Sequence, residues 1–427
     1  MTDVLNVFYE TTKVGQLTRD REHIYSFAYD GAWLSSPERF PLSLAMPLQV
    51  EPFGNVATLS FFENLLPEGG VKDILSKQHK LNSPLGFLKT FGKDCAGAVI
   101  VTADSTSPTI EVGTLPETKL DMALINQAID ERQSVAAVVS EHNPGYLSVA
   151  GAQDKFPAKF RAGDLYLPAP GAPTTHIVKP PVTHSGIKES VFNEYFCMML
   201  AQRVGLNVPQ CFICDTGKYP LFVIERYDRT ESETGLFHRL HQQDFCQAQG
   251  ILSEEKYEAM GGPSLHDNYK LIVKHVSVAQ RLKSALAFLD WVSFNLLIGN
   301  NDSHSKNIAF LMKENKIELA PYYDLLSTAI YPKLSRRFSF KIAGCDDASK
   351  IGPKQFLQLD QILGVKSGTF SKRVEMMTQK LLSHKEGLVS EMLVRYPGIK
   401  VFGRISNLIE KRCKGLISQG LTLTKAN

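Results

Sequence analysis

The side chains with the clearest chemical potential lie in a short polar segment, Gly299–Asn307, which reads GNNDSHSKN. Asp302 and Asn307 are five positions apart within it, the D-x-x-x-x-N spacing of loops that transfer phosphoryl groups. At this spacing an Asp can hold a substrate hydroxyl and accept its proton, while an Asn can offer an oxygen to Mg²⁺. Because Asp and Asn are also common in turns for local hydrogen-bonding reasons, the spacing alone leaves an ordinary turn open.

A second carboxylate follows at the position that this chemistry requires. Two short apolar runs, Ile308–Met312 and Ile317–Ala320, flank a polar turn and are predicted to form a β-hairpin. Asp324 comes directly after it, where a protein kinase places the Asp that carries its main Mg²⁺, normally within Asp-Phe-Gly. The Phe-Gly is missing here. The pattern predicts a proton acceptor, Asp302, and two metal ligands, Asn307 and Asp324, on neighbouring loops.

Upstream, the segment Gly145–Phe160 is predicted to form two strands around a turn at Ala150–Asp154. Small residues in such a turn let backbone N–H groups approach a phosphate. Neither G-x-x-x-x-G-K-[ST] nor G-x-G-x-x-G is present, so an ordinary hairpin turn remains the alternative for this segment taken by itself.

The next elements carry a lysine, a glutamate and a connecting segment in the order of a kinase. His176–Lys179 is a predicted strand that ends in Lys179, and the apolar spacing predicts a helix over Glu189–Val204 that contains Glu194. A strand Lys and a helix Glu form the ion pair that fixes the nucleotide-bound Lys of a kinase, although a solvent-facing Glu remains the simpler alternative. The strand Leu221–Ile224 then leads to the place of an adenine-binding hinge.

The predicted parts thus follow the order of the parts of a protein kinase. This order is the phosphate turn, the lysine on a strand, the glutamate on a helix, the hinge, the catalytic aspartate, the metal-binding asparagine and the metal-binding aspartate. The predicted fold is α/β (α+β), a protein-kinase-like two-lobed fold with an N-terminal β-rich module and an all-helical C-terminal lobe. The expected domains are a β-rich module at 1–105, a linker and helix at 106–145, a nucleotide-binding part at 146–230, and a helical lobe with the catalytic loop at 231–427.

Composition excludes several classes of protein. The 427 residues are 43% hydrophobic and 21% charged, as in soluble globular proteins, and the net charge of +3 is too small to indicate nucleic-acid binding. No apolar run approaches the roughly 18 residues of a membrane span, and no basic signal-peptide start is present. Seven Cys, an odd number, indicate reduced thiols, so we expect a cytoplasmic protein. A basic patch, Lys333, Arg336, Arg337 and Lys341, is either a solvated face or a contact for nucleic acid or an acidic partner.

Several longer strings resemble those of the HipA serine/threonine kinases, and the resemblance covers essentially the whole chain. It implies the toxin half of a type II toxin–antitoxin pair, which is linked to bacterial growth arrest and multidrug-tolerant persistence. The strings are LSVAGAQDK (Leu147–Lys155), HIVK (His176–Lys179), NEYFC (Asn193–Cys197), ERYDR (Glu225–Arg229), NNDSHSKN (Asn300–Asn307) and YYDLLS (Tyr322–Ser327).

The resemblance implies a role for each matching residue. Asp302 is the implied catalytic base, Asn307 and Asp324 the implied Mg²⁺ ligands, and Glu194 the implied ion-pair partner of Lys179. The implied ATP-binding residues are Ala150, Gly151, Ala152, Gln153, Asp154, Lys155, Lys179, Glu225, Arg226, Tyr227, His304, Ser305, Lys306, Asn307, Tyr323 and Asp324.

Regulation and partners are implied by the same resemblance. Ser148 corresponds to the family's autophosphorylation site, where a phosphate displaces the nucleotide loop and inactivates the enzyme. The implied partners are a small helix-turn-helix antitoxin, HipB, which binds operator DNA as a dimer, and a protein substrate from translation, in the best-known case an aminoacyl-tRNA synthetase. Asn300-Asn301 replace the usual His-Arg before Asp302, which favours regulation without activation-loop phosphorylation. The alternatives to a protein-kinase toxin are a small-molecule (sugar or antibiotic) kinase and a catalytically silent co-repressor.

Overall fold

A computed structural model describes residues 2–106, 108, 117–142, 150–168, 172–183, 186–233, 236–313 and 316–423. The chain divides into two compact units, and each is built from separate stretches of sequence. The first unit comprises Met1–Pro181, Phe212–Ser253 and Phe310–Asn315. The second unit comprises Val182–Cys211, Glu254–Ala309 and Lys316–Asn427.

The first unit begins with the predicted β-rich module. Its antiparallel sheet has the order β3-β2-β1-β4, and an apolar core that includes Phe27, Phe61 and Phe62 is fully buried beneath it. Gly15 is required on β2, because a Cβ there would lie 2.3 Å from the Ala28 carbonyl oxygen. The elements are β1 (Asp3–Tyr9), β2 (Thr12–Arg19), β3 (Tyr25–Tyr29), β4 (Val99–Thr102), α1 (Gly31–Ser35), α2 (Asn55–Phe62), α3 (Gly69–His79) and α4 (Pro84–Phe91).

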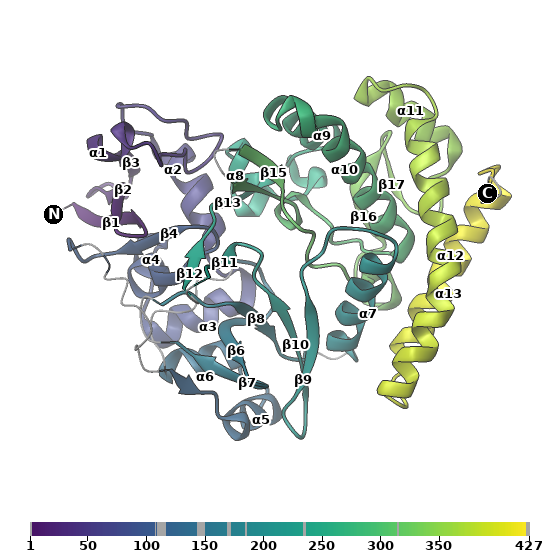
Figure 1. The fold of residues 1–427 in the computed structure, drawn as a ribbon, viewed down its shortest axis with the longest axis horizontal. Helices are drawn as coiled ribbons and strands as arrows, with labels where there is room; N and C mark the ends of the chain where they lie inside the picture. The colour runs from purple at the N-terminus through teal and green to yellow at the C-terminus, as the bar shows by residue number, and fades with distance from the viewer. Residues whose placement is uncertain are drawn as a thin grey trace. The chain divides into compact units, whose positions relative to one another are not determined.

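A six-stranded sheet with the order β5-β7-β6-β8-β10-β9 forms the second part of this unit (Figure 1). The segment predicted as a linker and helix, 106–145, contains one strand of this sheet, since β5 pairs with β7. β8 occupies His176–Lys179 as the sequence predicts, and it pairs antiparallel with both β6 and β10. The elements are β5 (Thr118–Lys119), α5 (Met122–Asp130), α6 (Val135–His142), β6 (Phe156–Arg161), β7 (Asp164–Leu167), β8 (His176–Lys179), β9 (Cys211–Asp215) and β10 (Pro220–Glu225).

The rest of the first unit consists of short elements after β10. β11 pairs with β12, and the backbone N–H of Met312 on β14 donates to the His241 carbonyl at 2.8 Å. A capping box fixes the start of α8, where Asp244 and Gln247 exchange side-chain and backbone hydrogen bonds. The elements are β11 (Arg229–Glu231), β12 (Phe237–Arg239), β13 (Gln242–Asp244), α8 (Phe245–Gln249) and β14 (Ala309–Lys313).

Helices dominate the second unit, as the sequence predicts for the C-terminal part of the chain. The helices α12 and α13 run side by side near the C-terminus (Figure 1), and each buries an apolar stripe that includes Leu381 on α12 and Ile405 on α13. The elements are α7 (Ser190–Arg203), α9 (Leu265–His275), α10 (Val278–Ile298), β15 (Lys316–Leu319), β16 (Arg337–Ile342), β17 (Cys345–Asp347), α11 (Pro353–Leu363), α12 (Thr369–Arg395) and α13 (Val401–Ser418).

This helical unit also contains a two-stranded sheet that the sequence reading did not anticipate. β16 and β17 pair antiparallel across the turn at Ala343-Gly344, and Arg337 on β16 forms an ion pair with Asp346. The strand β16 carries part of the basic patch, so these cations are spaced by strand geometry and not by a helix.

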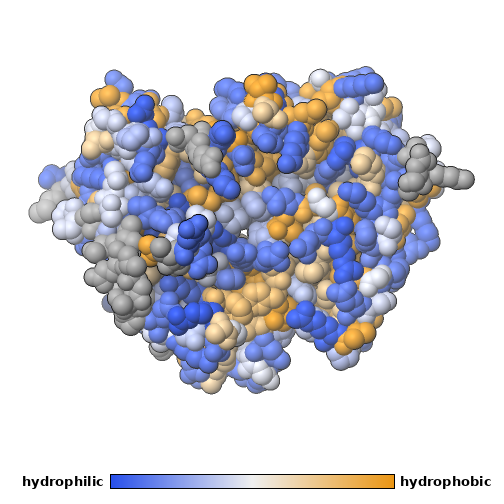
Figure 2. Space-filling model, in the orientation of Figure 1, coloured by the Kyte–Doolittle hydropathy of each residue, from blue (hydrophilic) through white to orange (hydrophobic). Residues whose placement is uncertain are grey.

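The surface and the cysteines can be described for the same part of the chain. Hydrophilic residues make up most of the face drawn in Figure 2, and hydrophobic ones are scattered between them. No helix in the described part of the chain is both long and apolar enough to cross a membrane. All seven cysteines are free thiols, and Cys211 and Cys214 are half-buried.

Candidate active site

The predicted catalytic loop starts where α10 ends. Gly299 closes the helix with φ +77°, and its N–H donates to the Asn295 carbonyl at 3.1 Å. A Cβ at Gly299 would lie 2.8 Å from side-chain carbons of both Ala329 and Leu408, so no other residue fits here. The loop residues beside Asp302 are buried, while the Asp302 side chain is 51% exposed. A carboxylate held on a buried loop but open to solvent can meet a hydroxyl on another molecule.

A buried asparagine joins this loop to the segment that contains Asp324. The Asn300 amide nitrogen donates to the Asp324 carbonyl at 3.1 Å and to Asn295 Oδ1 at 2.9 Å, and its Oδ1 accepts from the Asp302 N–H at 3.1 Å. Three partners satisfy a side chain that is only 1% exposed. Asn300 therefore holds the backbones of Asp302 and Asp324 within one side-chain length of each other, as the sequence predicts for neighbouring loops.

The side chains of Asn307 and Asp324 supply oxygen donors of the kind that Mg²⁺ prefers. Asn307 donates from Nδ2 to the Asp302 carbonyl at 2.8 Å, which leaves its amide oxygen as the atom that can meet a cation. Asp324 has a left-handed backbone conformation with φ +52°, which is uncommon outside glycine and frequent at functional sites. No group of three or more His, Cys, Asp or Glu in the described residues could hold a metal by itself. The donor set therefore fits a Mg²⁺ that is shared with phosphate oxygens and water.

Tyr257 is a functional candidate that the sequence reading missed. Its phenolic O–H donates to Asp302 Oδ1 at 2.5 Å, and its ring meets the His304 ring edge-on at 4.9 Å. The Tyr257 carbonyl accepts from the N–H groups of Met260 and Gly262, which fixes this turn. Tyr257 lies 45 residues before Asp302, and no local spacing could have indicated the contact.

Three further residues of the catalytic loop, His304, Ser305 and Lys306, are predicted to contact the nucleotide, and each has its own set of neighbours. His304 Nε2 is 4.0 Å from Asp302 Oδ1, and Lys306 is buried while its carbonyl accepts from the Tyr323 hydroxyl at 2.7 Å. The hydroxyl of Ser305 instead accepts from Asn268 Nδ2 on α9 at 2.9 Å, and Ser305 is fully buried. We therefore assign Ser305 a positioning role and not a side-chain contact with ATP.

The predicted phosphate turn lies in the first unit, next to the sheet. The Gly151 carbonyl accepts from the Glu68 N–H at 3.0 Å, which ties the turn to the N-terminal module. Gly151 has φ +107°, and a Cβ there would lie 2.8 Å from Lys155 Nζ, so the lysine folds over a bare backbone. Phe156, the first residue of β6, pairs with Val178 on β8. Lys155 directly precedes β6, and Lys179 is the last residue of β8.

Two of the predicted ATP ligands have structural partners instead. The Asp154 carboxylate accepts from Ser134 Oγ at 2.9 Å and from the N–H groups of Val135 and Ala136, so it caps α6. Burial raises the pKa of Asp154. The backbone N–H of Arg226 donates to the Thr175 carbonyl at 2.8 Å, and its guanidinium is buried in an ion network. The side chains of Asp154 and Arg226 are therefore not available to contact a nucleotide. Ala152 and Gln153 lie between Gly151 and Asp154 in the same turn.

The ion network that holds Arg226 is centred on Asp94 of the N-terminal module. Asp94 Oδ2 accepts from Arg226 at 3.1 Å, and its Oδ1 lies 2.7 Å from Arg229 and 3.4 Å from Arg239. Asp228 completes the network with contacts of 2.9 Å to Arg226 and 3.1 Å to Arg229. All five side chains are buried. Burial by itself would raise the pKa of Asp94, but the three arginines hold it below its usual range.

The remaining predicted residues lie at or after strand ends of the first unit, on a helix of the second unit, or outside the described residues. Lys179 is buried with its Nζ 5.8 Å from the centre of the Phe222 ring, and Glu225 is exposed at the end of β10. The Tyr227 hydroxyl hydrogen-bonds Gln242. Glu194 is buried on α7 in the second unit, and its pairing with Lys179 stays a prediction. Ser148 lies outside the described residues, as do Leu147 and Val149 of the predicted strand.

Comparison with known proteins places both parts of the chain in one family. Residues 147–385 match the HipA-like C-terminal domain, and residues 5–102 match the HipA N-terminal domain. The putative kinase Y4mE of Sinorhizobium fredii is 39% identical over 345 residues, which cover 79% of this chain and 80% of that protein. The serine/threonine-protein kinase toxin HipA of Shewanella oneidensis is 29% identical over 369 residues, covering 82% of this chain and 81% of that protein.

A solved structure shares the fold across nearly the whole chain. It is the Shewanella oneidensis toxin–antitoxin complex of HipA, HipB and operator DNA, and it covers 97% of both chains with a TM-score of 0.82 at 24% identity. The two-lobed, mixed helix and sheet architecture predicted from the sequence is therefore confirmed. With both of its domains matched in order, the chain belongs to the HipA family.

Proposed function

We propose that the chain is an ATP- and Mg²⁺-dependent serine/threonine protein kinase that acts as the toxin of a HipBA-type toxin–antitoxin pair. The observation that carries the proposal is the pair of hydrogen bonds through which Asn300 holds the backbones of Asp302 and Asp324. Relatives named as kinases support the activity, and one of them is named a toxin. Phosphoryl transfer needs positioning and charge stabilisation more than covalent help from the protein, and this loop pair offers both.

In the proposed reaction Asp302 holds the hydroxyl of a protein Ser or Thr by accepting its proton in a hydrogen bond. The hydroxyl oxygen attacks the γ-phosphorus of ATP, a new O–P bond forms, and the bond to the β–γ bridging oxygen breaks. The phosphoryl group ends on the substrate, ADP leaves with the electron pair of the broken bond, and Asp302 takes the proton. The exposed carboxylate of Asp302 suits this role because the substrate is another protein.

Other residues in this proposal hold and orient the phosphates. Lys155, directly before β6, and Lys179, at the end of β8, neutralise phosphate charge. Asn307 and Asp324 would hold Mg²⁺, which when bound neutralises charge that develops on the phosphate oxygens. Glu225 and Tyr227 remain the residues proposed to contact the adenine. His304, Lys306 and Tyr323 are the residues proposed to contact the phosphates.

The proposal includes partners that a relative's structure contains. The similar Shewanella oneidensis HipA is seen with HipB and operator DNA, and a HipB-like antitoxin is accordingly proposed here, with co-repression of the operon. A translation component, such as an aminoacyl-tRNA synthetase, is the proposed substrate.

The test of the proposed function is incubation of the purified chain with γ-labelled ATP and a cell extract. Label on protein supports the proposal, and label only on small molecules would replace it with a metabolite kinase.

We expect Tyr257→Phe to increase the rate of self-phosphorylation in single-turnover experiments about tenfold. The Tyr257 hydroxyl occupies the acceptor oxygen of Asp302 at the position where a substrate hydroxyl would donate. A hydrogen bond to a charged group contributes about 1.5–3 kcal/mol, and 1.4 kcal/mol corresponds to a factor of ten. Quench-flow measurement at saturating ATP gives the rate.

Tyr269→Phe on α9 is the matched control for Tyr257→Phe, because it removes a half-buried phenol elsewhere in the same unit. The control should leave the rate unchanged. A rate that falls in Tyr257→Phe would instead make Tyr257 a residue that orients Asp302 for catalysis.

Self-phosphorylation at Ser148 is the proposed off-switch. The wild type should gain one phosphate during incubation with ATP, as measured by mass spectrometry, and Ser148→Ala should gain none and stay active over repeated turnovers. The reason is that a dianionic group next to a phosphate-binding turn repels the nucleotide. Phosphate found at another serine in the wild type, with Ser148 unmodified, would contradict this assignment.

A further inference from the structure

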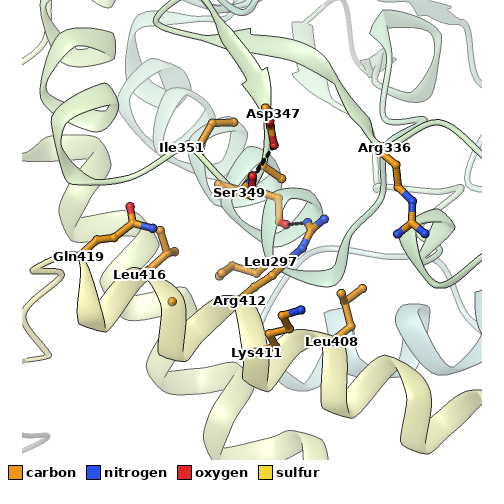
Figure 3. Close-up of a pocket in the computed structure, with 13 residues that line it drawn as sticks. Leu297, Arg336, Asp347, Ser349, Ile351, Leu408, Lys411, Arg412, Leu416 and Gln419 are labelled. Atoms are coloured by element: carbon orange, nitrogen blue, oxygen red, sulfur yellow. Dashed lines mark hydrogen bonds between the residues drawn. The ribbon is translucent and has the colours of Figure 1, made fainter. Parts of the chain in front are cut away.

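A cavity of about 440 Å³ lies in the second unit, and none of the predicted site residues that the structure describes lines it (Figure 3). Its walls are the C-terminal end of α10, the turn after β17 and one side of α13. Leu297, Ile351, Leu408 and Leu416 give it apolar walls. A cavity of this volume is in the usual range of sites for small organic ligands, about 300–1,000 Å³.

Three cations line the same cavity without carboxylate partners. Figure 3 shows Lys411 and Arg412 on α13 and Arg336 across from them. Within the described residues, none of the three has an Asp or Glu oxygen within 4.0 Å, and the two arginines donate to backbone carbonyls instead. The one acidic side chain at the cavity, Asp347, accepts from Ser349 N at 3.0 Å and from its hydroxyl at 2.7 Å, and lies 3.7 Å from Lys350. The cavity is therefore positively charged.

This arrangement of charge is unfavourable until an anion enters. Burial, followed by repulsion from Arg336, lowers the pKa of Arg412 to about 10. Like charges held near each other in a partly buried place raise the free energy of the folded chain. Guanidinium groups bind oxyanions through two parallel N–H bonds, so an oxyanion between Arg336 and Arg412 would remove the repulsion and satisfy both side chains.

The cavity is also connected to the end of α10. Arg412 donates to the Leu296 carbonyl, one of the carbonyls that the end of the helix leaves open. A Cβ built on Gly299 would lie 3.4 Å from Arg412 Cζ, so this guanidinium packs directly against the residue that begins the catalytic loop. On the other side, Arg336 donates to the Ala329 carbonyl, and the Ala329 N–H donates to the Gly299 carbonyl at 2.9 Å.

We propose that this cavity is a binding site for a small molecule that carries an oxyanion, phosphate or carboxylate, on an apolar body. Arg336, Lys411 and Arg412 bind the oxyanion, and the leucine and isoleucine side chains contact the body. An occupied site stiffens the last turn of α10 and Gly299, because Arg336 and Arg412 both connect to that turn. The proposal does not depend on the kinase function.

Isothermal titration of the full chain with phenyl phosphate, benzoate and inorganic phosphate tests the site. Phenyl phosphate or benzoate should bind at least about tenfold more tightly than inorganic phosphate, and the stronger of the two identifies the oxyanion. Arg336→Gln and Lys411→Gln should each weaken that binding about tenfold, since each removes one charge-assisted contact. Both side chains are exposed, so the fold should survive.

Lys354→Gln on α11 is the matched control, because it removes an exposed positive charge of the same unit outside the cavity. It should leave the affinity unchanged, as should saturating ATP. Hydrogen exchange should slow in peptides that cover Leu296–Asn301 when the ligand is bound. Equal affinity in Arg336→Gln, Lys411→Gln and wild type, or displacement of the probe by ATP, would overturn the proposal.

Discussion

Asp302→Asn is expected to keep the fold and the affinity for Mg-ATP while the rate of phosphoryl transfer falls about 10³-fold. A positioned general base contributes about 10²–10⁴ in rate, and the amide of Asn cannot take the proton of a substrate hydroxyl. The change is isosteric, and Asp302 is half exposed, so the loop bonds to Asn300 and Asn307 remain. Labelled phosphate transfer measures the rate, and calorimetric titration measures the affinity.

Asp324→Asn is the matched variant that separates proton transfer from metal binding. It should also lose transfer, but through weaker binding of Mg-ATP, because an amide is a poorer Mg²⁺ ligand than a carboxylate. Its backbone bond to Asn300 does not involve the side chain and should persist. Unchanged Mg-ATP affinity in Asp324→Asn, or a normal transfer rate in Asp302→Asn, would refute the roles assigned to these two carboxylates.

Asp94→Asn is expected to lower the free energy of unfolding by about 3–5 kcal/mol, the usual cost of removing one partner of a buried ion pair. The substitution leaves Arg226, Arg229 and Arg239 buried with Asp228 as the one remaining carboxylate of the network. Urea denaturation at pH 7 gives the difference. Asp73→Asn on α3, an exposed carboxylate of the same unit, is the control and should change stability by less than about 0.5 kcal/mol.

The difference in the free energy of unfolding between the wild type and Asp94→Asn should become smaller as the pH falls. Because the pKa of Asp94 is lowered in the folded chain, its stabilisation is fully present above the unfolded value of about 3.9 and is lost as pH falls below it. The wild type should therefore approach the stability of Asp94→Asn in acid. A difference that is constant from pH 7 to pH 3 would mean that packing, and not charge, accounts for the effect.

Local sequence predicted the parts of the site whose residues are close together or follow a fixed order. The spacing of Asp302 and Asn307, the strand that ends in Lys179 and the helix that carries Glu194 all depend on short-range patterns. The hairpin predicted before Asp324 made the approach of the two loops predictable. The β-rich module was predictable for the same reason, since short apolar runs such as Val4–Tyr9 are separated by polar turns.

Contacts between distant residues were not predictable, because they leave no local pattern. Asn300 reads as an ordinary turn residue, and only its bond to the Asp324 carbonyl, 24 positions away, gives it a role. Asp94 was in a segment without any visible cluster of charges, since its arginines follow 132 or more positions later. The guanidinium of Arg226, in the predicted hinge, is therefore a partner of Asp94.

The interleaved course of the two units has a consequence for synthesis on the ribosome. The last stretch of sequence that belongs to the first unit, Phe310–Asn315, is translated after Glu254–Ala309 of the second. Neither unit can complete its fold until residue 315 has emerged, and a nascent chain that stops earlier lacks Asp324 and the last strand of the first unit. A prematurely terminated product of this gene would consequently be an unfinished polypeptide and not a shortened folded protein.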